Sequence, residues 1–236
     1  KSEQIQNDRY RRGESVRGIV KSVEITSKGP EIIISRASNY FLIKLFEMEV
    51  PEIEDEIIEI KSVSRSPGER SKVVVYSSDV RIDAVGACVG MRGSRIQSIV
   101  RELNGEKIDI INFSDQPEIL LARAIAPAKP LNLFLDEEKP YAVMVFDDDE
   151  LAIAIGRNGQ NISLASDVTG YIIDAISKSD YNKQHGIVDE NDLSTIKGFS
   201  AKLLEILNEN EISTYDDFLE KKEQILKLKG FGEKSY

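Results

Sequence analysis

The residues with the clearest chemical meaning in this chain are two Gly-x-x-G stretches, each with an arginine between its glycines. The first is Gly90–Gly93 and the second is Gly156–Gly159, and a run with helical spacing follows each one. Glycine has no Cβ, so such a loop lets the backbone come very close to another molecule. The N–H groups and the positive dipole end of the following helix would face the same place. This combination suits a phosphate group.

Both loops lie in copies of one repeated unit. Aligning Gly90 with Gly156 also aligns apolar residues beside the loops, and the expected element order is α-β-β-α-α-β in each copy. Asn104 and Gly105 tolerate a left-handed backbone and are expected to end the last helix of the first copy. The first copy is expected to have a helix over 41–50, strands over 56–65 and 71–77, helix-loop-helix over 86–105 and a strand over 107–113. The corresponding ranges in the second copy are 117–128, 131–138, 141–146, 151–170 and 171–176.

Two other phosphate-binding motifs do not fit. A P-loop needs G-x-x-x-x-G-K-[ST], which this sequence lacks. A dinucleotide fingerprint needs a strand before its glycines, whereas a helix is expected here. The observed order is typical of a KH domain, whose loop clamps about four nucleotides of single-stranded nucleic acid. One copy alone would equally fit a tight helix–helix turn, but two copies in the same frame favour the KH interpretation.

The candidate nucleic-acid contacts are the loops and their neighbours. Arg92 and Arg157 add positive charge inside the loops, and Ser94 and Gln160 follow as possible hydrogen-bond donors. Nearby apolar side chains would form the floor of a groove for bases. The apolar candidates are Ala87, Val89, Ile96, Ile153, Ile155 and Ile162. The loop candidates are Gly90, Met91, Arg92, Gly93, Ser94 and Arg95 in the first copy, and Gly156, Arg157, Asn158, Gly159, Gln160, Asn161 and Ser163 in the second.

The composition excludes several other kinds of site. One Cys and one His in 236 residues exclude a disulfide framework and the usual zinc clusters. No apolar run approaches the ~20 residues that a membrane span needs. No secretory signal is recognisable, so we expect a cytoplasmic protein without membrane contact. The net charge of -10 by itself argues against nucleic acid. However, residues 1–36 and 88–129 carry a positive net charge, and the local field decides binding.

The chain ends are expected to form separate parts. Residues 10–36 have two β-branched runs, from Val16 onward, and predict two strands of a partial barrel. Arginines surround Tyr10 there, and they either contact a nucleic-acid backbone or are ordinary exposed residues. Polar residues 178–192 predict a linker. Residues 193–236 predict helices, with two I/L-K-G-F hairpins that favour protein contact over DNA binding.

Three smaller features have ordinary explanations. Asp147–Glu150 precede a predicted helix, so capping of its N–H groups is favoured over metal binding. Cys88 lies in an apolar stretch and is expected to be a buried, inert thiol. The acidic segment 51–59 is expected to be a solvated face, with contact to a basic protein as the alternative.

Longer stretches of the sequence resemble one protein family. The segments EVPEI, SPGERSKVVV, RIDAVGACVGMRGSRIQSI, GEKIDII and AIGRNGQNISLAS are similar to the tandem KH region of NusA, a family of bacterial transcription elongation, termination and antitermination factors. Residues 3–36 resemble the closing half of the OB-fold RNA-binding domain that precedes that region. The terminal hairpins resemble the helical repeats that follow it. From this resemblance, the family's N-terminal polymerase-binding domain and the first OB-fold strands are expected to be missing from this sequence.

This resemblance implies an α+β multidomain RNA-binding protein without enzymatic activity, cofactor or metal. Its two type II KH domains would bind one extended single-stranded RNA, with Ile162 and Ser163 beside bases. It would be a cytoplasmic monomer whose partners are RNA polymerase and other elongation and antitermination factors, and it would modulate pausing, termination and antitermination. The implied domains are a partial OB-fold over 1–37, KH domains over 38–115 and 116–180, a linker over 181–192, and a truncated helix-hairpin-helix-like domain over 193–236.

An accessory segment of an RNA-degrading exoribonuclease is the alternative, because those enzymes also combine KH and OB-fold domains. They place the KH domain first, whereas the OB-like strands come first in this chain. The order of domains therefore favours the transcription factor.

Overall fold

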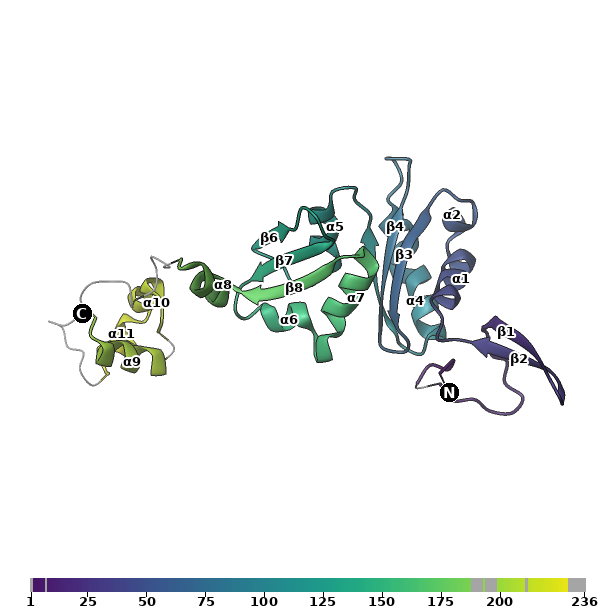
Figure 1. The fold of residues 1–236 in the computed structure, drawn as a ribbon, viewed down its shortest axis with the longest axis horizontal. Helices are drawn as coiled ribbons and strands as arrows, with labels where there is room; N and C mark the ends of the chain where they lie inside the picture. The colour runs from purple at the N-terminus through teal and green to yellow at the C-terminus, as the bar shows by residue number, and fades with distance from the viewer. Residues whose placement is uncertain (1, 7, 188–192, 194–198, 211, 229–236) are drawn as a thin grey trace. The chain divides into compact units, whose positions relative to one another are not determined.

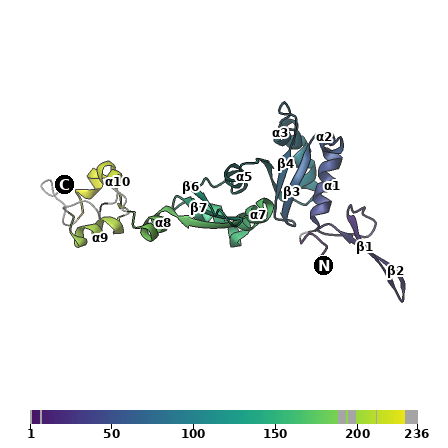
Figure 2. The same cartoon turned by 45° about the horizontal axis from the view of Figure 1, so that its top comes forward.

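The computed structural model describes residues 2–6, 8–187, 193, 199–210 and 212–228 (Figures 1 and 2). The chain divides into two compact units, Lys1–Ser177 and Lys178–Tyr236. The first unit contains three small β-sheets with their helices, and the described part of the second unit is helical. None of the helices in the described ranges is both long and apolar enough to cross a membrane.

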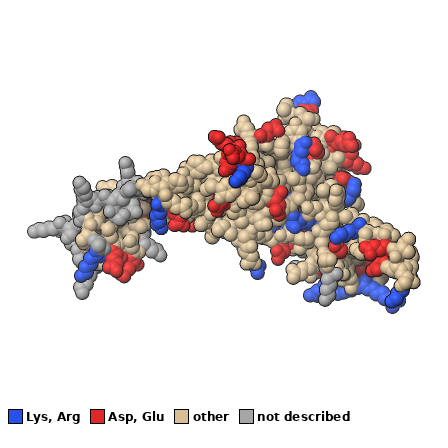
Figure 3. All heavy atoms as spheres, viewed as in Figure 1, with Lys and Arg blue, Asp and Glu red and all other residues tan. Residues whose placement is uncertain are grey.

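The N-terminal hairpin consists of β1 (Ile19–Thr26) and β2 (Gly29–Ser35), which pair only with each other. The two strands and their turn match the expectation, but no closed barrel forms among the described residues. β1 begins at Ile19 rather than near Val16. The carbonyl of Arg17, two residues before the strand, accepts a hydrogen bond of 2.7 Å from Arg36. Lys and Arg side chains gather over the hairpin and the segment before it (Figure 3).

The first module, residues 39–112, is a three-stranded sheet in the order β3-β4-β5, with one face covered by helices. β3 and β4 are antiparallel, and β4 and β5 are parallel. Phe41, Phe46 and Ile99 of the helices pack with Val73 and Val75 of the central strand in one core. Its elements are α1 (Asn39–Glu49), α2 (Pro51–Glu54), β3 (Glu59–Ser66), β4 (Arg70–Tyr76), α3 (Ala84–Val89), α4 (Ser94–Glu102) and β5 (Lys107–Asn112).

Local chemistry explains two boundaries in this module. The sequence predicts that the helix ends before Pro51, and α1 does, but the short helix α2 starts at Pro51 itself. Proline is favoured at this position because the N–H groups of a first helical turn have no acceptor within the helix. A residue without an N–H therefore loses no hydrogen bond there. After α4, Asn104 and Gly105 adopt φ of 57° and 93°, as expected. Their N–H groups donate to the carbonyls of Arg101 and Val100, which closes the helix end.

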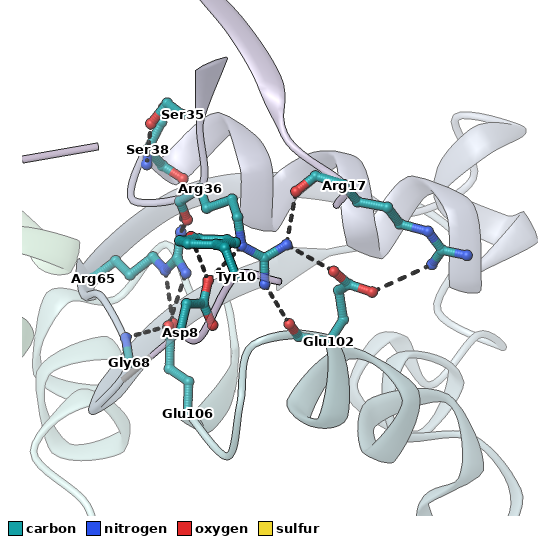
Figure 4. A network of polar contacts seen from close by, with 10 residues as sticks. All are labelled: Asp8, Tyr10, Arg17, Ser35, Arg36, Ser38, Arg65, Gly68, Glu102 and Glu106. Carbon is teal, nitrogen blue, oxygen red and sulfur yellow. Dashed lines mark hydrogen bonds and ion pairs between the residues drawn. The ribbon is translucent and has the colours of Figure 1, made fainter. Parts of the chain in front are cut away.

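Two buried arginines join the N-terminal segment and hairpin to the first module (Figure 4). Arg65 of the first module donates to the carbonyl of Arg36 at 2.8 Å, and its side chain is held by two hydrogen bonds of 2.7 and 2.8 Å to Glu106, both side chains being 0% exposed. Arg36 donates to Asp8 at 2.6 Å and to the carboxylate and carbonyl of Glu102, both at 2.8 Å. Burial opposes the Arg36 charge, but these carboxylates outweigh it and raise the pKa of Arg36. Paired charges therefore fix this joint.

The second module, residues 117–177, repeats the architecture of the first. Its strand order is β6-β7-β8, again antiparallel and then parallel. Leu121, Ala154 and Ala165 of its helices pack with Met144 and Phe146 of the central strand. This confirms the predicted internal repeat. Its elements are α5 (Pro117–Ala124), β6 (Asn132–Leu135), β7 (Tyr141–Phe146), α6 (Leu151–Ile155), α7 (Gln160–Thr169) and β8 (Ile172–Ser177).

The second face of the first module's sheet is covered by the second module. Helix α7 lies against β3 and β4, as both views show (Figures 1 and 2). Val74 and Ile111, which belong to β4 and β5, pack into the core of the second module. Ser62 of β3 donates a hydrogen bond of 2.6 Å to the carbonyl of Val168 in α7. The two modules thus share packed side chains and are parts of one body.

The start of the second unit differs from the sequence prediction. Residues 178–185, expected to be linker, form helix α8 (Lys178–His185). None of its side chains is buried, so it shows no apolar stripe from which a helix is usually recognised. Asp180 in the first turn and Lys183 in the last complement the helix dipole and lie 3.5 Å apart as an ion pair. Tyr181 and His185 also stack, at 4.1 Å between ring centroids.

The remaining described part of this unit has a small core of its own. Leu207, Ile212, Phe218 and Ile225 are buried together with Leu193. Most of the two predicted I/L-K-G-F hairpins, residues 194–198 and 229–231, lies outside the described residues, so that prediction stays untested. The helices are α9 (Ala201–Glu209), α10 (Tyr215–Glu220) and α11 (Lys222–Ile225).

Candidate nucleic-acid interface

The two Gly-x-x-G loops have the same backbone conformation. Gly90 and Gly156 have φ/ψ of 75/170° and 74/176°, and Gly93 and Gly159 have 78/13° and 74/11°. Between each pair of glycines, Arg92 and Asn158 are also left-handed, with φ of 54° and 52°. The repeat therefore extends to individual dihedral angles. Each loop is a tight turn between helices, so the function depends on what surrounds it.

The first glycine of each loop is required by packing. A Cβ on Gly156 would lie 2.7 Å from the Cβ and 2.9 Å from the backbone nitrogen of Asn161. A Cβ on Gly90 would lie 3.0 Å from both the Cβ and the backbone nitrogen of Arg95. These separations are well below the optimum for nonbonded atoms. The helices on either side of each loop consequently approach more closely than any residue other than glycine at this first position would permit.

The second glycine of each loop faces open space. A Cβ on Gly159 would meet no atom within 4 Å, and one on Gly93 would meet its nearest neighbours only at 3.9 Å. Each of these glycines is the N-cap of the following helix, α4 or α7, and no side chain caps either helix. An uncapped helix N-terminus with room beside it is where an anion binds favourably. The two glycines of a loop therefore have different roles.

The polar and charged loop candidates are mostly accessible. Arg92, Arg157 and Asn158 are exposed, and Met91 is 83% exposed. Neither arginine forms an ion pair with any residue in the described ranges. Ser94 and Ser163 are exposed as well. The positive charge predicted at each loop is thus available to a ligand.

The apolar candidates flank both loops. Ile153 and Ile155 in α6 are 45% and 36% exposed, which is high for isoleucine beside a packed helix. The other four, Ala87, Val89, Ile96 and Ile162, are half-buried. Each loop accordingly has partly exposed aliphatic side chains next to it, as a groove for bases requires.

Two candidates have side chains that turn inward rather than toward a ligand. Arg95 donates to the carbonyl of Ala87 at 2.7 Å. Asn161 is 2% exposed and donates to the carbonyl of Ala154 at 3.1 Å. Each lies five residues after its first glycine and bonds to the helix that precedes the loop. These equivalent residues hold the loop in place, so the prediction that their side chains contact nucleic acid is not supported.

The second loop lines a cleft of about 570 Å³ whose opposite wall belongs to the first module. Ser66, Glu69, Arg70 and Lys107 from β3, β4, β5 and the turn between β3 and β4 contribute to that wall. Glu69 accepts a hydrogen bond of 2.6 Å from the side chain of Gln160. These four residues could not be predicted from the sequence, since nothing in the local pattern links them to a loop far along the chain.

Two of the smaller features, Cys88 and the acidic run before α6, have different outcomes. Cys88 is fully buried as expected, and burial, with a smaller effect of Glu52, raises the pKa of its thiol to about 12. The acidic run Asp147–Glu150 directly precedes α6 as expected, but Glu150 makes no side-chain capping hydrogen bond. Glu150 is the N-cap but already has near-helical backbone angles, and its carboxylate accepts from the N–H of Lys129 at 3.3 Å. Within the described residues no group of three potential ligands could hold a metal ion.

Comparison with known proteins identifies both modules. Residues 36–113 match the family described as the NusA-like first KH domain, and residues 117–183 match the NusA-like second KH domain. The second match includes part of α8, which the sequence analysis had assigned to a linker.

Three curated relatives share this region, each named transcription termination/antitermination protein NusA. That of Halalkalibacterium halodurans is 44% identical over 189 residues, covering 80% of this chain and 50% of the relative. That of Bacillus subtilis is 44% identical over 179 residues, covering 76% and 48%. That of Rickettsia conorii is 40% identical over 187 residues, covering 78% and 37%.

The chain thus spans about half the length or less of these relatives. A solved structure titled "Crystal structure of APE1850" also matches, at 17% identity and a TM-score of 0.43, covering 59% of this chain and 96% of that chain. That likeness is too weak to support a conclusion. From the two matched domains and the identity to these relatives, the chain belongs to the NusA family.

Proposed function

We propose that this protein binds single-stranded RNA through both Gly-x-x-G loops and acts as a transcription factor that modulates pausing, termination and antitermination. The observation that carries the proposal is the pair of loops with matching dihedral angles, each with an open second glycine, in one compact unit. A loop that served only as a tight turn between helices would not need open space beside its second glycine. The names and identities of the relatives support the role in transcription.

The proposed mechanism is binding without covalent chemistry. The uncapped first turn of α4 or α7 and the adjacent arginine, Arg92 or Arg157, hold phosphates of the RNA backbone. Exposed aliphatic residues such as Ile153 and Ile155 support the bases. Because the modules share a core, one RNA strand would contact both loops at a fixed spacing.

The proposal extends to the setting of this activity. The protein would work in the cytoplasm as a monomer, in contact with RNA polymerase and other elongation and antitermination factors, as the similarity to its relatives suggests. It would leave the RNA chemically unchanged. A labelled RNA incubated with the protein, magnesium and phosphate should stay at full length, and shortening would favour the exoribonuclease alternative.

The decisive test replaces the second glycine of each loop with aspartate or asparagine. Both side chains are tolerated in left-handed backbone better than most, and no atom blocks them at Gly159. Asparagine is therefore a control of equal size and similar strain, and only aspartate adds a negative charge where a phosphate should lie.

We expect the double variant Gly93→Asp/Gly159→Asp to bind a single-stranded RNA of about ten nucleotides at least about tenfold more weakly than the double asparagine variant, because like charges would face each other. Fluorescence anisotropy measures the affinity, and circular dichroism checks the fold. Equal affinities for the two double variants, with both folded, would show that these loops do not bind RNA.

A further inference from the structure

The cleft beside the second loop contains more positive charge than the loop alone supplies. Arg157 comes from the loop, and Arg70 and Lys107 come from the first module. Arg70 is engaged by Asp109 through hydrogen bonds of 2.8 and 3.1 Å. Lys107 is exposed and forms no ion pair with any residue in the described part of the chain. Two unpaired cations from different modules thus line one cavity.

The same cleft contains one carboxylate, that of Glu69. It accepts the 2.6 Å hydrogen bond from Gln160, the first residue of α7 and one of the predicted phosphate donors. In this arrangement the carboxylate of Glu69 accepts the side-chain N–H of Gln160 that could otherwise donate to a phosphate oxygen. It also places a negative charge in the cavity that a phosphate would enter, which opposes binding.

We infer that this cleft binds a backbone phosphate of RNA between the second loop and the first module, with Arg157 and Lys107 as its cations and Glu69 as an internal competitor. The inference rests on the proposed function and deepens it. The second RNA site is then composite, because Lys107 reaches it from β5 of the neighbouring module. Both modules are needed to complete it, even for an RNA too short to touch the first loop.

The shared core explains how a composite site is possible. Val74 and Ile111 of the first module are buried in the second module's core, so the wall that carries Lys107 is held at a fixed position relative to Gly156–Gly159. If the two modules moved freely, ordering them on binding would cost entropy, and this cost would offset most of the binding free energy that the second cation contributes.

The test uses the full chain with Gly93→Asp, which blocks the first loop, and a fluorescein-labelled random single-stranded RNA of about five nucleotides. In this background Lys107→Gln should weaken binding about two- to fivefold, the range for an exposed charge pair. It should also lower the slope of log affinity against log salt by about 0.7. Lys139→Gln, an exposed lysine of the second module outside the cleft, is the matched control and should change neither.

The carboxylate should act with the opposite sign. Glu69→Gln keeps an oxygen that accepts from Gln160 but removes the charge, so binding should tighten about two- to fivefold. Glu138→Gln, at an exposed residue outside the cleft, controls for the change in net charge. Thermal melts that match the parent protein exclude a folding defect in every variant.

The outcomes separate this inference from the proposed function. If Gly159→Asp weakens binding relative to Gly159→Asn while the Lys107 and Glu69 variants behave like their controls, the composite cleft is wrong and the loop proposal stands. If Gly159→Asp and Gly159→Asn bind equally, the second loop does not bind RNA and both ideas fall.

Discussion

The different roles of the two glycines in each loop give a quantitative prediction. Replacing the first glycine by alanine should destabilise the protein far more than replacing the second. Gly156 has φ 74° and ψ 176°, a region that only glycine normally occupies and that costs of order 1–3 kcal/mol. The new Cβ would also lie 2.9 Å from the backbone nitrogen of Asn161, and such overpacking costs about 1–3 kcal/mol. We therefore expect Gly156→Ala to cost about 4 kcal/mol.

Gly159→Ala should cost much less. Its φ of 74° and ψ of 11° lie in the left-handed helical region, where alanine costs roughly 1–2 kcal/mol, and no atom lies within 4 Å of the added Cβ. The reduced freedom of the unfolded chain applies equally to both alanines and cancels in the comparison. The difference in the free energy of unfolding between Gly156→Ala and Gly159→Ala should thus be about 2–3 kcal/mol.

Urea unfolding followed by circular dichroism measures this difference, and the first loop provides an independent repeat. Gly90→Ala should behave like Gly156→Ala, and Gly93→Ala like Gly159→Ala, because the paired dihedral angles agree within a few degrees. Equal losses for the two alanines of one loop would show that its two glycines do not differ in their structural role. The opposite order in both loops would show that the second glycine is the structural one.

Three further predictions concern the packing of the first unit. Glu106→Gln leaves the charge of Arg65 buried without its counter-ion, and we expect a loss of about 3–5 kcal/mol in urea unfolding, where a loss below 1 kcal/mol would contradict us. The thiol of Cys88 should not react with a thiol reagent at pH 8 until the protein unfolds, since burial raises its pKa to about 12, and rapid reaction in the native state would show the thiol is accessible. Val74→Ala should cost about 2 kcal/mol and increase hydrogen exchange in α7 of the other module, whereas an effect confined to α1 and α4 would argue against a shared core.

Local patterns were sufficient for much of the fold. Apolar spacing predicted both copies of the repeat, and Asn104 and Gly105 were correctly expected to end α4. These features depend on residues that are close together in the sequence, so a short stretch of sequence is enough to predict them. Helix α8 was missed for the same reason, since its stabilising contacts are between polar side chains such as Tyr181 and His185 rather than along an apolar face.

The candidate site was only partly predictable. The glycines and their exposed arginines could be recognised because the residues that form each loop are consecutive in the sequence. Arg95 and Asn161 were assigned to the ligand because both are polar and close to a loop, yet each bonds to the preceding helix. Their inward direction follows from the close approach of two helices, which a one-dimensional pattern does not contain.

Two glycine loops, each between helices, in a duplicated α-β-β-α-α-β unit can be predicted from the sequence, because backbone freedom and helical or strand periodicity are local properties. The residues that each loop faces, in contrast, depend on how distant segments of the chain pack together. Lys107 and Glu69 lie beside the second loop because the first module's sheet packs against the second module, with Val74 and Ile111 buried in the second module's core. Burial of apolar surface between segments far apart in the chain sets such neighbours, and no local pattern records which segments will meet.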